Sequence, residues 1–265
     1  MNAPPSRIEV QGHRGCRGLR PENTMAAFEH AARLGVDVLE LDVGLTRDGV
    51  LAVAHDPEVN PERCSGGEGL SSRLIRDLSF AELRTLDCGA QKNPRFPEQQ
   101  PAPGQRMPRL EEVLDLLARH RALGANVEIK TFTDRRQATW PPARFAAALV
   151  PLIRERGLVG RVTVQSFDPL ALQEVARASG GTFSLSALAN RRGDFRPMLQ
   201  ETGARILSPR HTELRRADVE ALHHDGVRVI PWTVNEPARM RELIGWGVDG
   251  IITDRPDLLL GLVRP

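Results

Sequence analysis

The first strand–helix–strand unit of this chain is the stretch IEVQGHRGCRGLRPENTMAAFEHAARLGVDVLELD, residues 8–42. The β-branched run Ile8–Gly12 predicts a strand, the amphipathic run Thr24–Leu34 a helix, and Val36–Asp42 a second strand. Apolar residues in the helical run recur at spacings of three and four, as a helix that packs on a sheet requires. The unit is therefore typical of the repeating element of α/β proteins.

The same alternation continues to the end of the chain. Further strands are predicted at Asn126–Lys130, Arg161–Gln165, Thr182–Ser186, Arg205–Leu207, Val227–Pro231 and Gly250–Thr253. Further helices are predicted at Leu110–His120, Pro142–Arg156, Pro169–Ala178, Ala217–Asp225 and Pro237–Trp246. Eight strands alternating with helices favour an α/β fold of the TIM (β/α)₈ barrel type. An open doubly wound sheet is the alternative, but no GxGxxG fingerprint follows the first strand.

One segment, at about residues 57–108, breaks this rhythm. It is rich in Pro, Gly, Ser, Gln and Arg, and it predicts only one short helix at Ser79–Leu86. A loop of this length inside a compact domain has a function of its own or is mobile. We interpret it as an insertion after the second strand, over the barrel mouth, with too few apolar residues for its own core. Residues 1–265 then form a single barrel domain.

Bulk composition bears on partners and compartment. The net charge of +2 implies neither nucleic acid nor an anionic membrane as a partner. The three cysteines, Cys16, Cys64 and Cys88, are odd in number and lack a CxxC pair, which predicts a reducing compartment without a disulfide framework. The N-terminal residues lack the features of a secretory signal, and no apolar run is long enough for a membrane span. We expect a cytoplasmic protein without stable membrane insertion; its oligomeric state is left open.

Carboxylates cluster at the ends of two predicted strands. Glu40 and Asp42 are two residues apart and so share one face of their strand, and Glu128 and Lys130 repeat the pattern on a later strand. Three carboxylates form an oxygen-only set that suits Mg²⁺ or Ca²⁺ better than zinc. Lys130 would supply a positive charge for an anionic substrate. The plainer alternatives are solvated acids at Glu40 and Asp42 and an internal Glu128–Lys130 salt bridge.

Two histidines accompany these groups. His13 and Arg14 lie between glycines at the end of the first strand, where a ligand can approach the backbone closely. An arginine can bind two phosphate oxygens, and a histidine can transfer a proton near neutral pH. The dipeptide Asp48-Gly49 predicts a two-residue hairpin turn, which would place His55 opposite Asp42. The alternatives are a surface His-Arg pair in a turn and a structural His55.

At this point the sequence resembles the glycerophosphodiester phosphodiesterase family. The resemblance rests on blocks that follow the family order along nearly the whole chain: His13-Arg14-Gly15, Pro21-Glu22-Asn23-Thr24, Glu40-Leu41-Asp42-Val43, Thr46-Arg47-Asp48-Gly49, His55-Asp56, Glu128-Ile129-Lys130, Gln165-Ser166-Phe167-Asp168, Trp232-Thr233-Val234-Asn235 and Asp249–Asp254. The first four blocks with His55-Asp56 are the most specific. The inserted segment is where selectivity for the head group would be set.

The resemblance implies a role for each matching residue. The metal, Mg²⁺ or Ca²⁺, would be held by Glu40, Asp42 and Glu128. The general base and acid would be His13 and His55, in an order that the sequence leaves open. Arg14 and Lys130 would bind the phosphate and Trp232 would wall the glycerol or the alcohol, with Glu22, Asn23, Gln165 and Phe167 in support. Asp254 is expected to cap the final helix. The substrate would be a glycerophosphodiester, and the products glycerol 3-phosphate and an alcohol such as choline.

Three other functions remain alternatives. One is a related enzyme that acts on lysophospholipids and stops at a cyclic phosphate; the apolar rim or secretory route that it needs is not evident. Another is a barrel that binds ligand without catalysis, although every catalytic position of the family pattern is intact. The last is a metal-dependent enzyme of carbon acids, which would leave the paired histidines and Arg14 without a clear task.

Overall fold

A computed structural model describes residues 7–193 and 195–264. Eight parallel strands form a sheet in the order β8-β7-β6-β5-β4-β2-β1-β9, and β3 pairs antiparallel with β2. The strands are β1 (Glu9–Gly12), β2 (Val38–Leu45), β3 (Leu51–Val53), β4 (Gly124–Ile129), β5 (Val162–Ser166), β6 (Ser184–Ala189), β7 (Ile206–Pro209), β8 (Arg228–Val229) and β9 (Gly250–Thr253). These strands confirm the predicted alternation.

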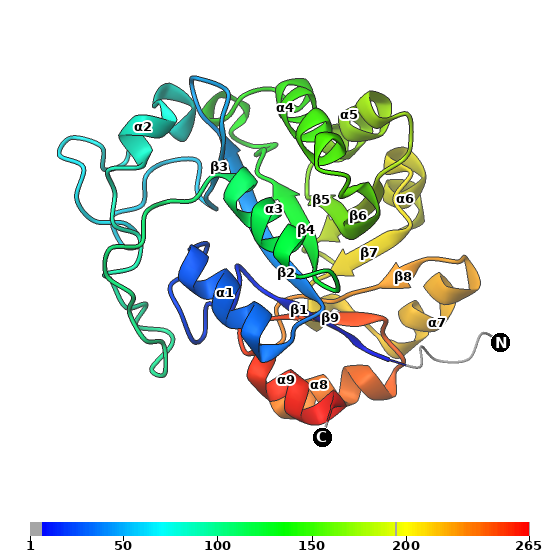
Figure 1. The fold of residues 1–265 in the computed structure, drawn as a ribbon. Helices are drawn as coiled ribbons and strands as arrows, with labels where there is room; N and C mark the ends of the chain where they lie inside the picture. Colours follow the sequence, from blue (N-terminus) through cyan, green and yellow to red (C-terminus); the bar gives the residue numbers. More distant parts are fainter. Residues whose placement is uncertain (1–6, 194, 265) are drawn as a thin grey trace.

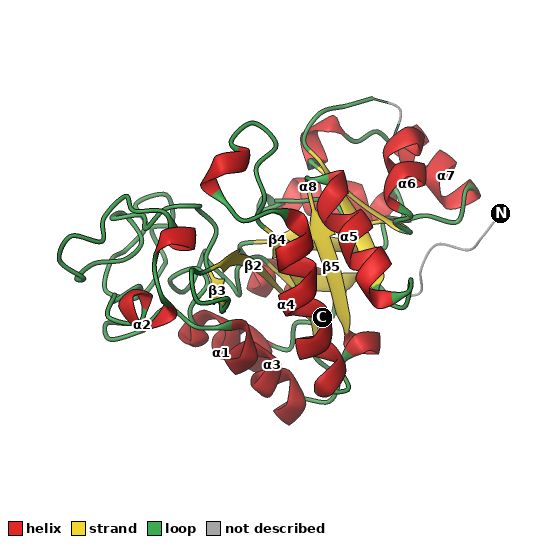
Figure 2. Ribbon diagram, turned by 90° about the horizontal axis from the view of Figure 1, so that it is seen from above, coloured by secondary structure: helices red, strands yellow, loops and turns green. Residues whose placement is uncertain are grey.

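Helices surround the strands, as Figures 1 and 2 show from two directions. They are α1 (Met25–Leu34), α2 (Phe80–Leu83), α3 (Leu110–Arg119), α4 (Pro142–Glu155), α5 (Pro169–Ser179), α6 (Arg196–Thr202), α7 (Arg216–His224), α8 (Pro237–Gly245) and α9 (Pro256–Val263). Short 3₁₀ turns lie at Ile75–Asp77, Arg136–Ala138, Val159–Arg161 and His211–Glu213. Helix α6 was not predicted, because it buries only Leu199 and Thr202 and so lacks a clear apolar period.

The sheet curves round until its two ends meet. β1 pairs with β9, and backbone hydrogen bonds join β9 to the segment that contains β8: Asp249 to Val229 at 2.9 Å and Ile252 to Pro231 at 3.0 Å. An open doubly wound sheet would leave these edges apart. The structure therefore confirms a TIM-like barrel, and the carboxyl ends of its parallel strands meet at one mouth.

Local signals fix where the helices begin and end. The Thr24 hydroxyl accepts a hydrogen bond from the Ala27 amide at 3.2 Å at the start of α1, and Gly35 ends that helix with φ 87°, a conformation that a side chain disfavours. Asp168 caps α5 by accepting from the Leu170 amide at 3.2 Å. These contacts hold the loop of residues 13–24 and the end of β5 at the mouth.

The β2–β3 hairpin differs from its prediction by one residue. Val43 pairs with Val53 and Leu45 with Leu51, so Ala54, and not His55, lies opposite Asp42; the Ala54 amide donates to the Asp42 carbonyl at 3.1 Å. The turn holds three residues, Arg47–Gly49, because the Thr46 amide bonds to the Val50 carbonyl. The predicted register is wrong. His55 still reaches the site because it follows directly after the strand.

The inserted segment has a core of its own, contrary to our prediction. Ten buried residues form a cluster separate from the barrel core: Ala52, Val59, Cys64, Leu70, Ile75, Leu78, Leu83, Leu86, Cys88 and Met107. Cys64 and Cys88 form a disulfide, so the prediction of a chain without disulfides is also wrong. The sequence spacing gave no indication that these two cysteines meet. The insertion is the looped segment that projects to one side of the barrel in both views.

Candidate active site

The predicted functional side chains gather at the barrel mouth. They lie on neighbouring strands or directly after them: His13 and Arg14 after β1, Glu40 and Asp42 on β2, Glu128 and Lys130 at the end of β4, and Gln165 and Phe167 at the end of β5. A pocket at this mouth is lined by the following residues among others: His13, Arg14, Glu40, His55, Glu128, Lys130, Gln165, Phe167 and Trp232. One cavity thus brings together nine of the twelve predicted site residues.

The three predicted metal ligands form a compact cluster. Oxygen atoms of Glu40, Asp42 and Glu128 all lie within 4.8 Å of one another. The register explains this closeness, because Asp42 pairs directly with Glu128 across the two strands. Their side chains are almost fully enclosed, with residue exposures of 1%, 1% and 7%. Buried carboxylates at this distance repel one another unless a cation lies between them.

The electrostatics of this cluster fit a divalent cation. Burial, together with the charges of Asp42 and Glu128, raises the pKa of Glu40 well above its usual value. Burial also raises the pKa of Glu128. Asp42 is the exception: burial opposes its ionisation, but the charge of Arg14 holds its pKa well below the usual range. An oxygen-only set of this kind suits Mg²⁺ or Ca²⁺.

Two cationic side chains lie against the carboxylates. Arg14 donates through its amide to Glu40 at 2.9 Å and through Nη1 to Glu22 at 2.6 Å. Lys130 donates to Glu128 at 2.7 Å, and its Nζ lies 3.7 Å from Asp42. Burial opposes the charge of Lys130, but these two carboxylates raise its pKa. Both cations therefore stay charged at the edge of the triad, where a phosphate would approach.

Both histidines are held in the same way. The Nδ1 atom of His13 lies 2.6 Å from Asp254 and that of His55 lies 2.7 Å from Asp56. A carboxylate at Nδ1 fixes the ring and leaves Nε2 free to exchange a proton with a ligand. The Nε2 atom of His13 lies 3.9 Å from Glu40. Burial and the nearby Arg17 charge lower the pKa of His13 to about 4, so that ring is neutral at pH 7.

Asp254 takes a different position from the one that the sequence interpretation expected. Arg255, and not Asp254, occupies the cap position of α9. The buried Asp254 carboxylate instead accepts from His13, from Arg17 Nε at 2.6 Å and from Asn235 Nδ2 at 2.7 Å. One signal was present in the sequence. Asp254 directly follows the last strand of the barrel, as His13 follows the first.

The supporting residues also take defined positions. Gln165 donates to Glu40 at 2.7 Å, and Asn23 donates to Asp42 at 2.9 Å, so each amide orients one carboxylate. The rings of Phe167 and Trp232 meet edge to face, with centroids 5.4 Å apart. The Trp232 indole donates to the Ser208 carbonyl at 2.8 Å. Phe167 and Trp232 both line the pocket, so together they form an aromatic wall of it.

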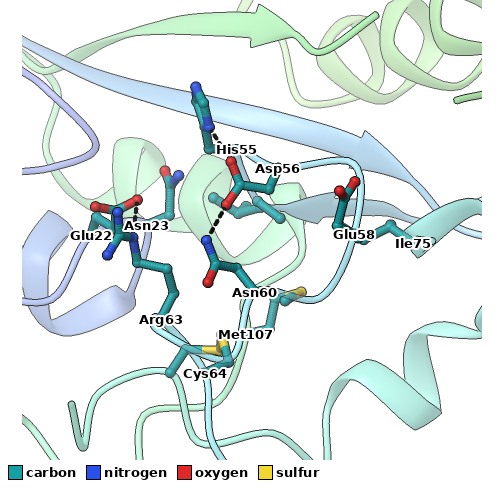
Figure 3. A pocket seen from close by; sticks show the side chains of 13 residues that line it. Glu22, Asn23, His55, Asp56, Glu58, Asn60, Arg63, Cys64, Ile75 and Met107 are labelled. Atoms are coloured by element: carbon teal, nitrogen blue, oxygen red, sulfur yellow. Dashed lines mark hydrogen bonds and ion pairs between the residues drawn. A yellow bond between two sulfur atoms is a disulfide. The ribbon is translucent and has the colours of Figure 1, made fainter. Parts of the chain in front are cut away.

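Arg63 lies near the site although the sequence did not indicate it. No charged residue of the insertion is among the predicted site residues. Arg63 Nε lies 3.3 Å from Glu22, the residue that also binds Arg14. Figure 3 shows this pair beside the row formed by His55, Asp56 and Asn60. The insertion thus contributes directly to the surroundings of the site.

Comparisons with known proteins agree with this arrangement. The model of the glycerophosphoryl diester phosphodiesterase family matches residues 13–258. A glycerophosphodiester phosphodiesterase from Caldanaerobacter subterraneus is 35% identical over 96% of this chain and 97% of its own length. One from Bacillus subtilis is 30% identical over 96% and 86%.

Solved structures show the same fold. A candidate glycerophosphoryl diester phosphodiesterase from Silicibacter pomeroyi superposes with a TM-score of 0.90 at 30% identity, covering 98% of this chain and 94% of its own. A phosphodiesterase from Oleispira antarctica, solved with the product sn-glycerol-3-phosphate, superposes with a TM-score of 0.82 at 22% identity, covering 98% of both chains.

The fold, the site and these likenesses together define a class, the phosphoric diester hydrolases built on a TIM-type barrel. Within that class, the chain belongs to the glycerophosphoryl diester phosphodiesterase family, whose activity is the hydrolysis of glycerophosphodiesters. Among the residues that the structure describes, no helix combines the length and the apolar character needed to span a membrane.

Proposed function

We propose that this enzyme hydrolyses glycerophosphodiesters such as glycerophosphocholine and glycerophosphoethanolamine to glycerol 3-phosphate and the free alcohol. One observation carries this proposal: a buried carboxylate triad lies at a barrel mouth with two histidines, each held at Nδ1 by a carboxylate. We place the reaction in phospholipid and glycerol metabolism. The cytoplasmic location expected from the sequence would require the Cys64–Cys88 disulfide to persist in a reducing compartment, where structural disulfides are rare. Residues 1–265 would act as one barrel domain with an insertion at about residues 57–108.

The carboxylates and cations would bind the phosphodiester. Glu40, Asp42 and Glu128 would hold Mg²⁺ or Ca²⁺, which when bound stabilises negative charge on the phosphoryl oxygens. Arg14 and Lys130 would bind the non-bridging oxygens, because both border the triad and remain charged. The supporting contacts of Glu22, Asn23 and Gln165 orient these groups and keep them rigid.

The histidines would move the protons. One imidazole accepts the proton of the attacking hydroxyl, which belongs to water or to the glycerol itself, and the other donates a proton to the leaving alcohol oxygen. In each ring Nε2 does this work, since Nδ1 bonds to Asp254 or Asp56. Trp232 and Phe167 form the wall that positions the glycerol or alcohol carbons.

Product analysis tests this proposal. The protein is incubated with glycerophosphocholine and Mg²⁺ or Ca²⁺, and the products are followed by phosphorus NMR. We expect glycerol 3-phosphate to accumulate, with at most a transient cyclic phosphate. A cyclic phosphate that persists would favour the lyase alternative. Unchanged substrate with either metal, for a folded protein, would favour a barrel that binds without catalysis.

A further inference from the structure

Arg17 is a third cationic side chain in the active-site pocket, which it lines together with Arg14 and Lys130. It lies in the loop of residues 13–24 that follows β1. It is not among the predicted site residues, and the proposed function gives it no task. Its contacts indicate what it does.

Two contacts hold Arg17 from the protein side. Its Nε atom donates to Asp254 at 2.6 Å, and the side chain of this aspartate is only 1% exposed. Its guanidinium carbon lies 5.4 Å from the ring centre of Phe96, a residue of the insertion. A carboxylate at Nε and a ring against one face together fix the plane of the guanidinium. Arg17 is therefore held in place and is not a freely solvated arginine.

The outer edge of this guanidinium is open. Among the residues that the structure describes, none accepts a hydrogen bond from Nη1 or Nη2 of Arg17; the Glu22 carboxylate lies 3.9 Å from Nη1, beyond hydrogen-bond distance. Arg14 and Lys130, in contrast, each donate from a terminal nitrogen to a carboxylate. Of the three cations, Arg17 is thus the one whose terminal N–H groups are available to a ligand in the pocket.

The position of Arg17 beside His13 indicates which part of a ligand it would bind. One atom, Oδ1 of Asp254, lies 2.6 Å from both Nδ1 of His13 and Nε of Arg17. The two side chains are therefore neighbours across a single oxygen, and both line the pocket. A phosphoryl group that exchanges a proton with His13 would bring a non-bridging oxygen close to Arg17. A planar guanidinium edge suits such an oxygen.

We propose that Arg17 is a third phosphate-binding residue, which donates from its Nη atoms to a non-bridging phosphoryl oxygen on the His13 side of the pocket. This inference rests on the proposed function. The competing explanation is that Arg17 only positions Asp254, and through it His13. That role would need Nε alone and would make no contact with the substrate.

Phosphorothioate substrates separate the two explanations. Sulfur replaces one non-bridging oxygen of glycerophosphocholine in each of two diastereomers, and sulfur is a weak hydrogen-bond acceptor. The kcat/KM values for the oxygen substrate and for both diastereomers are measured with Mg²⁺ or Ca²⁺. The proteins are wild type, Arg17→Ala, Arg17→Lys and the control Arg20→Ala. Arg20 belongs to the same loop but does not line the pocket.

The loss of a contact with phosphate should appear in two ways. We expect kcat/KM for the oxygen substrate to fall about tenfold or more in Arg17→Ala and to stay nearly constant in Arg20→Ala. In wild type, sulfur at the oxygen that Arg17 binds should slow the reaction about tenfold. In Arg17→Ala this sulfur effect should shrink to about twofold or less, because the contact is already lost. Arg17→Lys keeps a charge near Asp254 without the planar edge, and gives the same test if Arg17→Ala fails to fold.

Binding of glycerol 3-phosphate adds a measurement that needs no turnover. Calorimetry with each protein and Ca²⁺ gives its Kd, which we expect to rise about tenfold in Arg17→Ala and to stay constant in Arg20→Ala. An unchanged Kd in Arg17→Ala would overturn the inference, whether or not the protein hydrolyses glycerophosphodiesters.

The kinetic outcomes also separate this inference from the proposed function. Sulfur effects that are equal in wild type and in both Arg17 variants, for both diastereomers, would leave Arg17 as a positioning residue and overturn the inference while hydrolysis stands. Equal losses in Arg17→Ala and Arg20→Ala would show a general effect of charge and would contradict it. If wild type hydrolysed no glycerophosphocholine with either metal, the proposed function would fail, and the binding measurement alone would decide the inference.

Discussion

The Nδ1 atom of His13 lies 2.6 Å from the Asp254 carboxylate, although 241 positions separate the two residues in the chain. The contact crosses the seam where β1 meets β9, so closure of the barrel also assembles this pair. Arg17 and Asn235 fill the remaining positions around the carboxylate. Asp254 is therefore a positioning residue for His13.

Replacing this carboxylate should affect catalysis more than binding. In wild type the Asp254 carboxylate favours the His13 tautomer with its proton on Nδ1. In Asp254→Asn the side-chain amide can instead donate an N–H to Nδ1, which favours the tautomer with the proton on Nε2. We expect kcat to fall about a hundredfold or more, with KM little changed. Steady-state kinetics check this result. The matched control is Asp249→Asn. The Asp249 carboxylate also binds a histidine, with 2.9 Å to Nε2 of His223, but that histidine is not one of the site residues. Equal losses in the two variants would contradict a specific role.

The contact between Asp56 and His55 should make the free energy of unfolding depend on pH. The hydrogen bond from His55 lowers the pKa of Asp56 to about 2, below the usual value near 4. A depressed pKa in the folded state stabilises the fold above the unfolded value, and this contribution is lost as pH falls from about 4 through about 2. We therefore expect the difference in unfolding free energy between wild type and Asp56→Asn to narrow over that range. Urea unfolding at pH 7, 4 and 3 measures it, and a constant difference would count against the prediction.

The carboxylate triad should link metal binding to stability. A divalent cation relieves the repulsion among Glu40, Asp42 and Glu128, so it binds the folded state and raises Tm. At a metal concentration one hundred times Kd the gain is about 2.7 kcal/mol, which is a shift of several degrees. Thermal unfolding with Ca²⁺, Mg²⁺ or chelator measures it. Glu128→Gln should lose most of the shift and the exposed Glu29→Gln should keep it. A metal shift as large in Glu128→Gln as in wild type would place the cation elsewhere.

The disulfide should stabilise the insertion. It joins Cys64 to Cys88 across 24 positions, and closing a loop of this length restricts the unfolded chain by about 3 kcal/mol. Reductant should therefore lower the stability of wild type and of Cys16→Ala, but not that of the double variant Cys64→Ser/Cys88→Ser. Thiol titration provides a second check. The oxidised protein should show one thiol, and only after unfolding, because burial raises the pKa of Cys16 to about 12.

Much of the fold was predictable because local and long-range signals agreed. The helix Met25–Leu34 shows its apolar period, its threonine cap and its terminal glycine within a few residues of sequence. The face shared by Glu40 and Asp42 follows from strand geometry alone. The carboxylate triad could be predicted as well, because parallel strands of a barrel end at the same mouth.

The failures concern contacts that depend on tertiary structure. The hairpin register changed by one residue because Thr46 closes a three-residue turn, and a dipeptide pattern does not determine loop length. The insertion core is assembled from residues spaced without helix or strand period, so its apolar content gave no periodic signal. The Cys64–Cys88 bond and the His13–Asp254 contact both join distant positions.

The most direct test of the central claim is metal-dependent release of glycerol 3-phosphate from glycerophosphocholine by wild type and by Glu40→Ala. The two proteins are assayed with Mg²⁺, with Ca²⁺ and with chelator, after their folding is compared by circular dichroism. We predict release by wild type that requires one of the metals and collapses in Glu40→Ala, because Glu40 belongs to the buried triad. Release that survives chelation, or that Glu40→Ala retains in full, would contradict the proposal that the triad is the catalytic metal site.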